Sequence, residues 1–189
     1  MTIDEIEFES FMKIQQNRSR SVSKNKVSDW VNFSYGKHSI FKGYKSLTEE
    51  VVLRKYRKVS LSNKKDVYHV IFDKTPFYPE GGGQIGDSGI LENSNKKINI
   101  INTFKENDSI IHVAEESPDG FLKRVKAVVN KERRFLTSIN HSCTHILHNA
   151  LRNILGDHVN QRGSMVNSKI LRFDFSHFTK ISESEIKKI

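Results

Sequence analysis

The chain has 189 residues, of which 36% are hydrophobic and 28% charged, and its formal net charge is +9 at pH 7. It has no signal-peptide pattern, no run of the roughly 18 apolar residues that a membrane span needs, and only one cysteine, so we predict a cytoplasmic protein without disulfides or a membrane partner. A fold does not require such an excess of positive charge, which therefore indicates an anionic partner such as nucleic acid, unless the whole proteome is rich in lysine.

The first 28 residues are predicted to form a helix followed by a polar linker. Thr2 begins a T-x-x-E capping box, in which two side chains satisfy backbone N–H groups of the first helical turn. Phe8, Phe11 and Met12 then recur at helical spacing. The residues that follow are mostly Ser, Asn, Lys and Arg, which leaves almost nothing to bury and indicates a linker.

Residues 29–130 are predicted to form an antiparallel β-barrel-like subdomain. Short segments rich in Val, Ile, Phe and Tyr alternate there with polar turns, a pattern typical of barrels and sandwiches. The expected strands are residues 39–44, 50–61, 67–73, 97–104, 109–113 and 121–130.

A glycine-rich stretch, TPFYPEGGGQIGDSG, interrupts these strands at residues 75–89. Its five glycines and two prolines are incompatible with a regular strand. The stretch is not a phosphate-binding P-loop, because no Gly-Lys-Ser/Thr ends it, and it is not a dinucleotide fingerprint, because no helix follows. Gly81, Gly82 and Gly83 allow very close approach by a ligand or by a neighbouring element, so the stretch is either a binding loop or a tight structural turn.

Residues 131–189 are predicted to form an α/β subdomain in which a central helix packs on an antiparallel sheet, so the expected fold class is α+β. The helix is expected to begin at Asn140 as its N-cap and to end at Gly156. Its apolar stripe is expected to comprise Ile146, Leu147, Ala150, Leu151, Ile154 and Leu155. A β-hairpin with strands at residues 157–166 and 169–176 follows, and another helix starts after Ser182.

His141 and His145 are four residues apart, so one face of the central helix is expected to carry both imidazoles. This is the geometry of the two-histidine half of a zinc site, although a pair of solvated imidazoles has the same spacing. A metalloprotease is excluded because Ser142 stands where the general base Glu would follow the first His. Cys143 points away from this face and is expected to be a small packing residue, and His148 at most supports the pair.

Three motifs, in this order, carry a resemblance to a known family: the glycine-rich stretch, RRFLTSINHSCTHILHNALRNILGDHVNQRGSMV and LRFDFSH. From about Phe41 onwards they resemble the editing domain of alanyl-tRNA synthetase and the related free-standing AlaX trans-editing proteins. FESFMKIQQNRSR is similar to the segment that joins the tRNA-recognition part of the synthetase to its editing domain, which AlaX proteins usually lack. The resemblance therefore favours an internal fragment of the synthetase, truncated at its C-terminus. Because AlaX proteins often have the triple glycine of EGGGQ, a free-standing hydrolase stays an alternative.

The resemblance implies hydrolysis of the ester in mischarged Ser-tRNA(Ala) and Gly-tRNA(Ala). An alanine pocket cannot exclude smaller glycine and rejects the serine hydroxyl only weakly, so a second site is needed. The resemblance also implies zinc, held by His141, His145 and a downstream C-x-x-x-H pair that this sequence does not reach. We therefore expect an incomplete zinc site and little activity, and a catalytically silent tRNA-binding module is the alternative. ATP and magnesium would belong to an aminoacylation domain outside this chain.

Carried over by position, Gln161 matches a family glutamine near the scissile ester, and Thr75 opens the glycine-rich motif; both are candidate catalytic residues. Gln161 would position water or the amino acid, and the hydroxyl of Thr75 would pair with the serine side chain. The backbone amides of the three glycines, Gly81 to Gly83, would line the pocket, and His177 would be a supporting or structural residue. The candidates for contacts with tRNA phosphates are Arg133, Arg134, Arg162 and Arg172. The alternative for each is an ordinary solvent-exposed charge.

Overall fold

The computed structural model describes residues 7–13, 15, 26–34, 39–62, 65–94, 96–121 and 124–189. Residues 7–13 are helical, whereas the expected capping box at Thr2 and most of the expected linker lie outside the described residues. Phe8 and Phe11 of this helical segment are exposed. The fold is α+β, as the sequence predicts.

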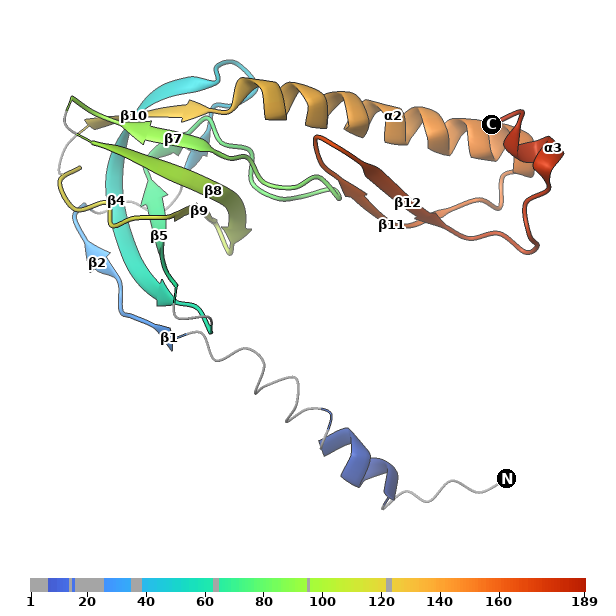
Figure 1. Cartoon of the computed structure of the whole chain (residues 1–189), viewed down its shortest axis with the longest axis horizontal. Coiled ribbons are helices and arrows are strands. Elements are labelled where there is room, and N and C mark those ends of the chain that lie inside the picture. The colour runs from blue at the N-terminus through green and yellow to red at the C-terminus, as the bar shows by residue number, and fades with distance from the viewer. Residues whose placement is uncertain are drawn as a thin grey trace.

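Six antiparallel strands close into a barrel in the order β4, β10, β7, β8, β9 and β5, and β5 pairs back with β4 (Figure 1). Inward-facing side chains such as Phe72, Leu91 and Ile100 form its core, as expected for a barrel small enough to be filled by side chains. The strands are β4 (Thr48–Ser60), β5 (Asp66–Phe72), β7 (Gly89–Glu92), β8 (Lys97–Glu106), β9 (Ser109–Ala114) and β10 (Arg124–Val129).

Among the described residues, four strands of two residues each lie beside this closed ring. β1 (Lys26–Val27) and β2 (Val31–Asn32) pair antiparallel with β4, and β3 (Ile40–Phe41) pairs parallel with β6 (Lys74–Thr75). The expected strand at residues 39–44 is therefore largely wrong, because the chain turns at residues 43–45.

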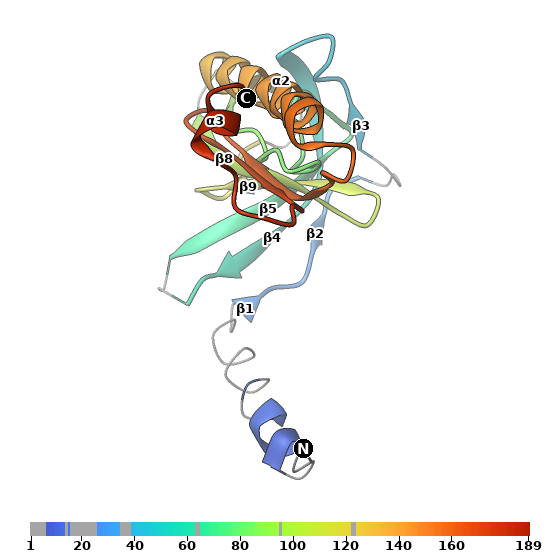
Figure 2. The same ribbon diagram turned by 90° about the vertical axis from the view of Figure 1, so that its right-hand side faces the viewer.

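A long helix, α2 (Lys131–Leu155), leaves the end of β10 and extends away from the barrel (Figures 1 and 2). Its N-cap is Asn130, whose side-chain oxygen accepts a hydrogen bond from the backbone N–H of Arg133 at 2.9 Å. The expected start at Asn140 is therefore wrong. The polar helical turns that precede Asn140 are stabilised by tertiary contacts with the barrel. The helix ends at Gly156, as predicted, with φ at 113°.

A hairpin of β11 (Gln161–Val166) and β12 (Leu171–Phe175) lies along one side of α2 (Figures 1 and 2). It confirms the expected hairpin, with shorter strands. The last helix, α3 (Glu183–Ile186), begins after Ser182, as predicted, and Ser182 forms a complete capping box with Glu185. In the part of the chain that the structure describes, α2 and the other helices are too short or too polar to cross a membrane.

The buried face of α2 is centred on Thr137, Thr144 and Leu151, which follow one another at seven-residue intervals. The expected apolar stripe is only partly correct, since Leu151 is buried but the side chain of Ile146 is 68% exposed. The assignment of Cys143 to packing is wrong, because Cys143 is exposed. A face anchored by threonines does not stand out as apolar in the sequence.

Candidate functional site

The imidazoles of His141 and His145 lie together on one face of α2, as their spacing predicts. Their ring centroids are 5.1 Å apart and the ring planes are inclined by 29°, so the rings are stacked. His141 is half-buried and His145 is exposed. The pair therefore lies at a surface that solvent can reach.

Gln84, which directly follows the three glycines, holds the ring of His141. Its side-chain oxygen Oε1 lies 2.8 Å from Nδ1 of His141, and the residue is 7% exposed. A carbonyl oxygen only accepts hydrogen bonds, so this contact requires the proton of a neutral imidazole to be on Nδ1. The lone pair is then on Nε2, the arrangement in which a histidine can coordinate a metal or accept a proton.

The glycine-rich loop between β6 and β7 reaches from the barrel to β11 (Figure 1). Val166 donates its backbone N–H to the carbonyl of Gly83 at 2.7 Å, and Ile85 donates to the carbonyl of Val166 at 3.0 Å. Gly83 has φ at 79°, and a Cβ added to it would collide with Oγ of Ser164. Only glycine therefore fits this close approach of loop and strand without strain.

The same approach brings the triple glycine to the histidine pair. A Cβ added to Gly82 would lie 4.0 Å from Cε1 of His141, so the loop backbone and the imidazole are neighbours. Gln161 is linked to this region through Ser164, because its Nε2 donates to Oγ of Ser164 at 3.0 Å. The loop, β11 and α2 thus bring His141, Gly82, Gly83, Gln84, Ser164 and Gln161 into one region.

Two imidazoles are a partial donor set for a metal. Within the residues that the structure describes, no group of three or more His, Cys, Asp or Glu side chains lies close enough together to hold an ion. Neutral imidazoles nevertheless suit zinc, and the contact from Gln84 leaves Nε2 of His141 available as a ligand atom. The residues therefore fit half of a tetrahedral zinc shell.

Thr75 lies in the barrel core rather than at the histidine pair. It is fully buried, its Oγ1 is 2.7 Å from Nε2 of His112, and it accepts a hydrogen bond from the backbone N–H of Phe77 at 3.1 Å. Because the hydroxyl already has two partners, a serine side chain does not reach it in this conformation. The structure thus gives Thr75 the surroundings of a structural residue.

The side chain of Arg134 is also largely buried, in contrast to the prediction that it contacts a tRNA phosphate. Its guanidinium forms an ion pair with both carboxylate oxygens of Asp87 and donates to the carbonyls of Gly43 and Pro76, each at 3.1 Å. Asp87 in turn accepts from the backbone N–H of Tyr78 at 2.8 Å. This buried pair joins the first turn of α2 to the glycine-rich loop and the barrel.

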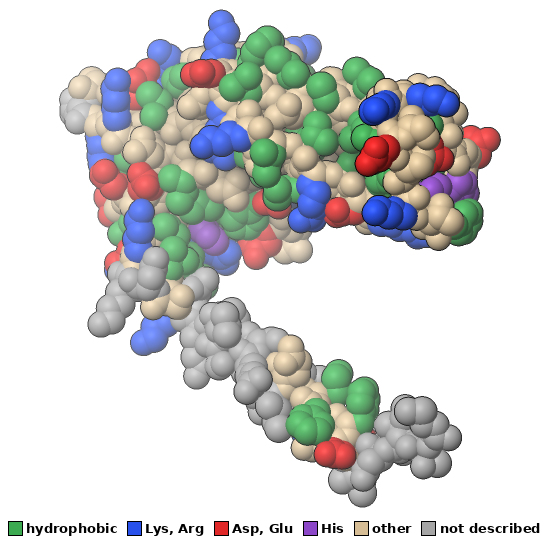
Figure 3. All heavy atoms as spheres, turned by 45° about the vertical axis from the view of Figure 1, so that its right-hand side comes forward, with side chains coloured by type: hydrophobic (Ala, Val, Ile, Leu, Met, Phe, Trp, Pro, Cys, Tyr) green, Lys and Arg blue, Asp and Glu red, His purple; other side chains and the backbone are tan. Residues whose placement is uncertain are grey.

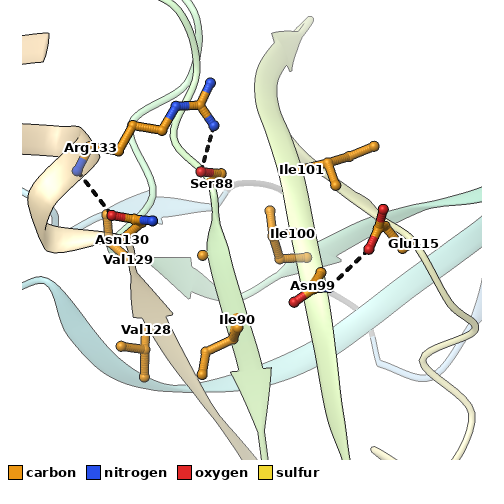
Figure 4. A pocket seen from close by; sticks show the side chains of 11 residues that line it. Ser88, Ile90, Asn99, Ile100, Ile101, Glu115, Val128, Val129, Asn130 and Arg133 are labelled. Carbon is orange, nitrogen blue, oxygen red and sulfur yellow. Dashed lines mark hydrogen bonds between the residues drawn. The ribbon is translucent and has the colours of Figure 1, made fainter. Parts of the chain in front are cut away.

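The neighbouring Arg133 reaches from α2 to Oγ of Ser88 at 2.5 Å, beside a pocket of about 510 Å³ (Figure 4). Apolar side chains of β7, β8 and β10, including Ile90 and Val128, also line this pocket, together with Asn99, Glu115 and Asn130. Neither histidine of the pair lines it, so this hollow is separate from the candidate site.

The other expected residues are more exposed. Arg162 lies on the exposed start of β11, and Arg172 pairs with Asp174 on β12 at 3.1 Å. His177 lies beside His158, with Nδ1 and Nε2 of the two rings 2.8 Å apart. Lys and Arg side chains are spread over the face seen in Figure 3, with Asp and Glu between them, so this face carries no single basic patch.

Sequence reasoning missed Gln84, Ser164 and Asp87. The signal for Gln84 was its position directly after the glycines, but its partner His141 is 57 residues away in the sequence. Ser164 and Asp87 act through contacts between elements that only the fold brings together.

Comparison with known proteins gives consistent results along the chain. A family model described as tRNA synthetases class II (A) matches residues 1–133. The chain is 45% identical to the alanine–tRNA ligase of Christiangramia forsetii over 188 residues, which are 99% of this chain and 22% of that protein. It is 46% identical to the alanine–tRNA ligase of Cytophaga hutchinsonii over 189 residues, with 100% and 21% covered. The chain thus spans about a fifth of the length of these curated relatives.

Proposed function

Because the chain belongs to the family of class II tRNA synthetases (A), we propose that it is the part of an alanine–tRNA ligase that hydrolyses mischarged tRNA(Ala) in the cytoplasm. The substrates are Ser-tRNA(Ala) and Gly-tRNA(Ala), and the bond broken is the ester between the amino acid and the terminal ribose. In this proposal the complete protein also ligates alanine to tRNA(Ala) with ATP and magnesium, in a domain outside these 189 residues.

One observation supports this proposal above the others: the triple-glycine loop docks beside the histidine pair, and the oxygen of Gln84 accepts from Nδ1 of His141, which places the lone pair of the neutral ring on Nε2. An ester hydrolase needs a group that activates water or polarises the carbonyl, and it needs donors for the developing oxyanion. The imidazoles and the loop backbone supply groups of both kinds at one place.

The backbone of the glycines provides the donors. The N–H groups of Gly82 and Gly83 donate to no backbone carbonyl within the described part of the chain, and both residues have positive φ. Two hydrogen bonds hold the loop in place: the side chain of Gln84 bonds to His141, and the backbone N–H of Val166 donates to the carbonyl of Gly83. These two amides are therefore free to bind the ester oxygen, which carries negative charge as water attacks.

We propose that His141 and His145 hold zinc together with donors from outside the described residues, since tetrahedral zinc takes four ligands. When bound, zinc supplies Lewis-acid polarisation of the ester or of its attacking water. Gln161, oriented by its hydrogen bond to Ser164, positions the amino acid or the water beside the loop. Its exposed amide both donates and accepts, as this role requires.

The test compares Ser-tRNA(Ala) hydrolysis by an alanine–tRNA ligase containing this segment with hydrolysis by the 189-residue chain. We expect the ligase to release serine and to spare Ala-tRNA(Ala), and we expect the shorter chain to bind tRNA but to hydrolyse slowly. A segment that binds tRNA without any hydrolysis in either protein would be a tRNA-binding module, and the proposed activity would then be wrong.

A further inference from the structure

A second hollow adjoins the glycine-rich loop on the barrel. It has a volume of about 510 Å³, and Gly81 forms part of its wall, next to the Gly82 that faces His141. Three aromatic side chains line it: Phe41 at the end of β3, Tyr44 in the following turn and Tyr78 in the loop itself. We call it the aromatic pocket.

The ring of Tyr44 in the aromatic pocket is largely exposed to solvent. Phe41 packs edge-to-face against Tyr44, with centroids 4.9 Å apart, and against Tyr78, with centroids 5.9 Å apart. Tyr44 is nevertheless 84% exposed. A tyrosine held against a neighbouring ring while it faces solvent is the kind of platform on which unpaired bases stack.

Contacts with Asp87 and Arg134 fix the position of the residues that carry these aromatic rings. The backbone N–H of Tyr78 donates to Asp87 at 2.8 Å, and the guanidinium of Arg134 lies 5.8 Å from the centre of the Tyr78 ring. The carbonyl of Gly43, next to Tyr44, accepts from the same guanidinium. The buried ion pair of Arg134 and Asp87 thus connects the pocket to α2, which carries the histidine pair.

Charged side chains surround the rings in a pattern that suits a nucleotide. Lys105 lines the pocket and forms no ion pair within the described ranges, and the exposed Lys42 and Lys45 lie on either side of Tyr44 in the sequence. These ammonium groups favour a phosphate. Glu80 and Asp108 line the same pocket, and carboxylates accept hydrogen bonds from the exocyclic amino groups of bases.

We propose that the aromatic pocket binds an unpaired cytosine or adenine of an RNA strand, with the base stacked on Tyr44 and its phosphate near Lys105. This inference rests on the proposed function and names a binding site for its substrate. Every tRNA ends in unpaired C-C-A, whose bases all carry an exocyclic amino group. A nucleotide bound here is next to the loop that faces His141, so binding places the end of the strand near the ester-hydrolysing groups.

The test measures binding of a fluorescein-labelled oligoribonucleotide of C and A to the 189-residue chain by fluorescence anisotropy. We expect Tyr44→Ala to weaken binding about tenfold or more, because one stacked base is lost, and we expect Tyr44→Phe to retain most of the affinity. Lys105→Ala should weaken binding mainly at low salt, since its contribution is electrostatic. A uridine oligomer of equal length should bind more weakly, and Glu80→Gln should reduce this difference.

Phe178→Ala is the matched control, because Phe178 is 85% exposed and lies outside the pocket. It should leave binding unchanged, and a thermal melt should show that each variant is folded. No RNA binding by the wild-type chain, or equal binding by Tyr44→Ala, would overturn the proposal, and equal affinity for uridine would overturn the base preference. Because the oligoribonucleotide contains no amino-acid ester, these outcomes do not depend on whether the protein hydrolyses one.

Discussion

The side-chain oxygen of Gln84 lies 2.8 Å from Nδ1 of His141, so a loop of the barrel determines which nitrogen of an imidazole on α2 carries the proton. The fold brings these two residues together across 57 positions of sequence. Since the amide oxygen accepts a hydrogen bond from Nδ1–H, the lone pair of the neutral imidazole is on Nε2. The candidate site therefore depends on two parts of the chain, and neither part is sufficient alone.

The first prediction concerns this contact. Replacing Gln84 with Ala should weaken the affinity of the chain for Zn²⁺ about 10–100-fold, because the imidazole loses the partner that orients it. Gln84→Glu keeps an acceptor and should retain more of the affinity. Titration calorimetry measures the effect, with Gln161→Ala as the control. Equal Zn²⁺ affinities for the wild type and Gln84→Ala would show that Gln84 does not support the site.

The second prediction separates backbone strain from the close approach of loop and strand. Gly83 and Gly120 both have positive φ, but a Cβ on Gly83 would collide with Ser164 whereas one on Gly120 would meet nothing within 4 Å. Gly120→Ala should therefore lower the free energy of unfolding by about 1–2 kcal/mol. Gly83→Ala should cost roughly 1–3 kcal/mol more because of the collision, as urea denaturation would show. Equal losses would mean that the loop does not dock on β11 this closely.

The third prediction concerns the buried ion pair. Arg134→Ala leaves the carboxylate of Asp87, which is 6% exposed, without its partner and should lower the free energy of unfolding by about 3–5 kcal/mol. Arg152→Ala removes an arginine whose partner Asp157 is exposed, and it should have little effect. Chemical denaturation of both variants tests this difference. A mild effect of Arg134→Ala, accompanied by weaker tRNA binding, would instead favour its original reading as a phosphate contact.

The fourth prediction concerns pH. Burial lowers the pKa of His112 to about 4, and its ring donates from Nδ1 to the carbonyl of Val70 and accepts from Thr75. The folded protein therefore resists a proton that the unfolded chain takes up near pH 6.5. The contribution of neutral His112 to the free energy of unfolding is therefore fully present above pH 6.5. As the pH falls from 6.5 towards 4, this free energy decreases by roughly 3 kcal/mol.

Comparison of the wild type with His112→Gln isolates this effect. Their unfolding free energies should converge as pH falls from 6.5 to 4, because only the wild type carries the buried imidazole. Burial and the Arg57 guanidinium also lower the pKa of His69 to about 4, but His69 is present in both proteins and its contribution cancels. A constant difference across this pH range would contradict the assigned state of His112.

The sequence predicts what depends on local spacing and misses what depends on tertiary contacts. The shared face of His141 and His145 follows from helical periodicity alone, and the stop at Gly156 follows from its backbone freedom. The true start of α2 was missed because Arg134 is stabilised by a carboxylate 47 residues away. Thr75 was expected at the substrate, but its hydroxyl bonds to a buried histidine whose position only the barrel determines.

The most direct test of the central claim measures Ser-tRNA(Ala) hydrolysis by an alanine–tRNA ligase that carries this segment with both His141→Ala and His145→Ala. A His158→Ala variant is the control, because His158 belongs to the separate pair with His177. We predict that the double variant still charges tRNA(Ala) with alanine but no longer removes serine, whereas the control does both. Serine removal at the wild-type rate by the double variant would contradict the assignment of ester hydrolysis to these two imidazoles.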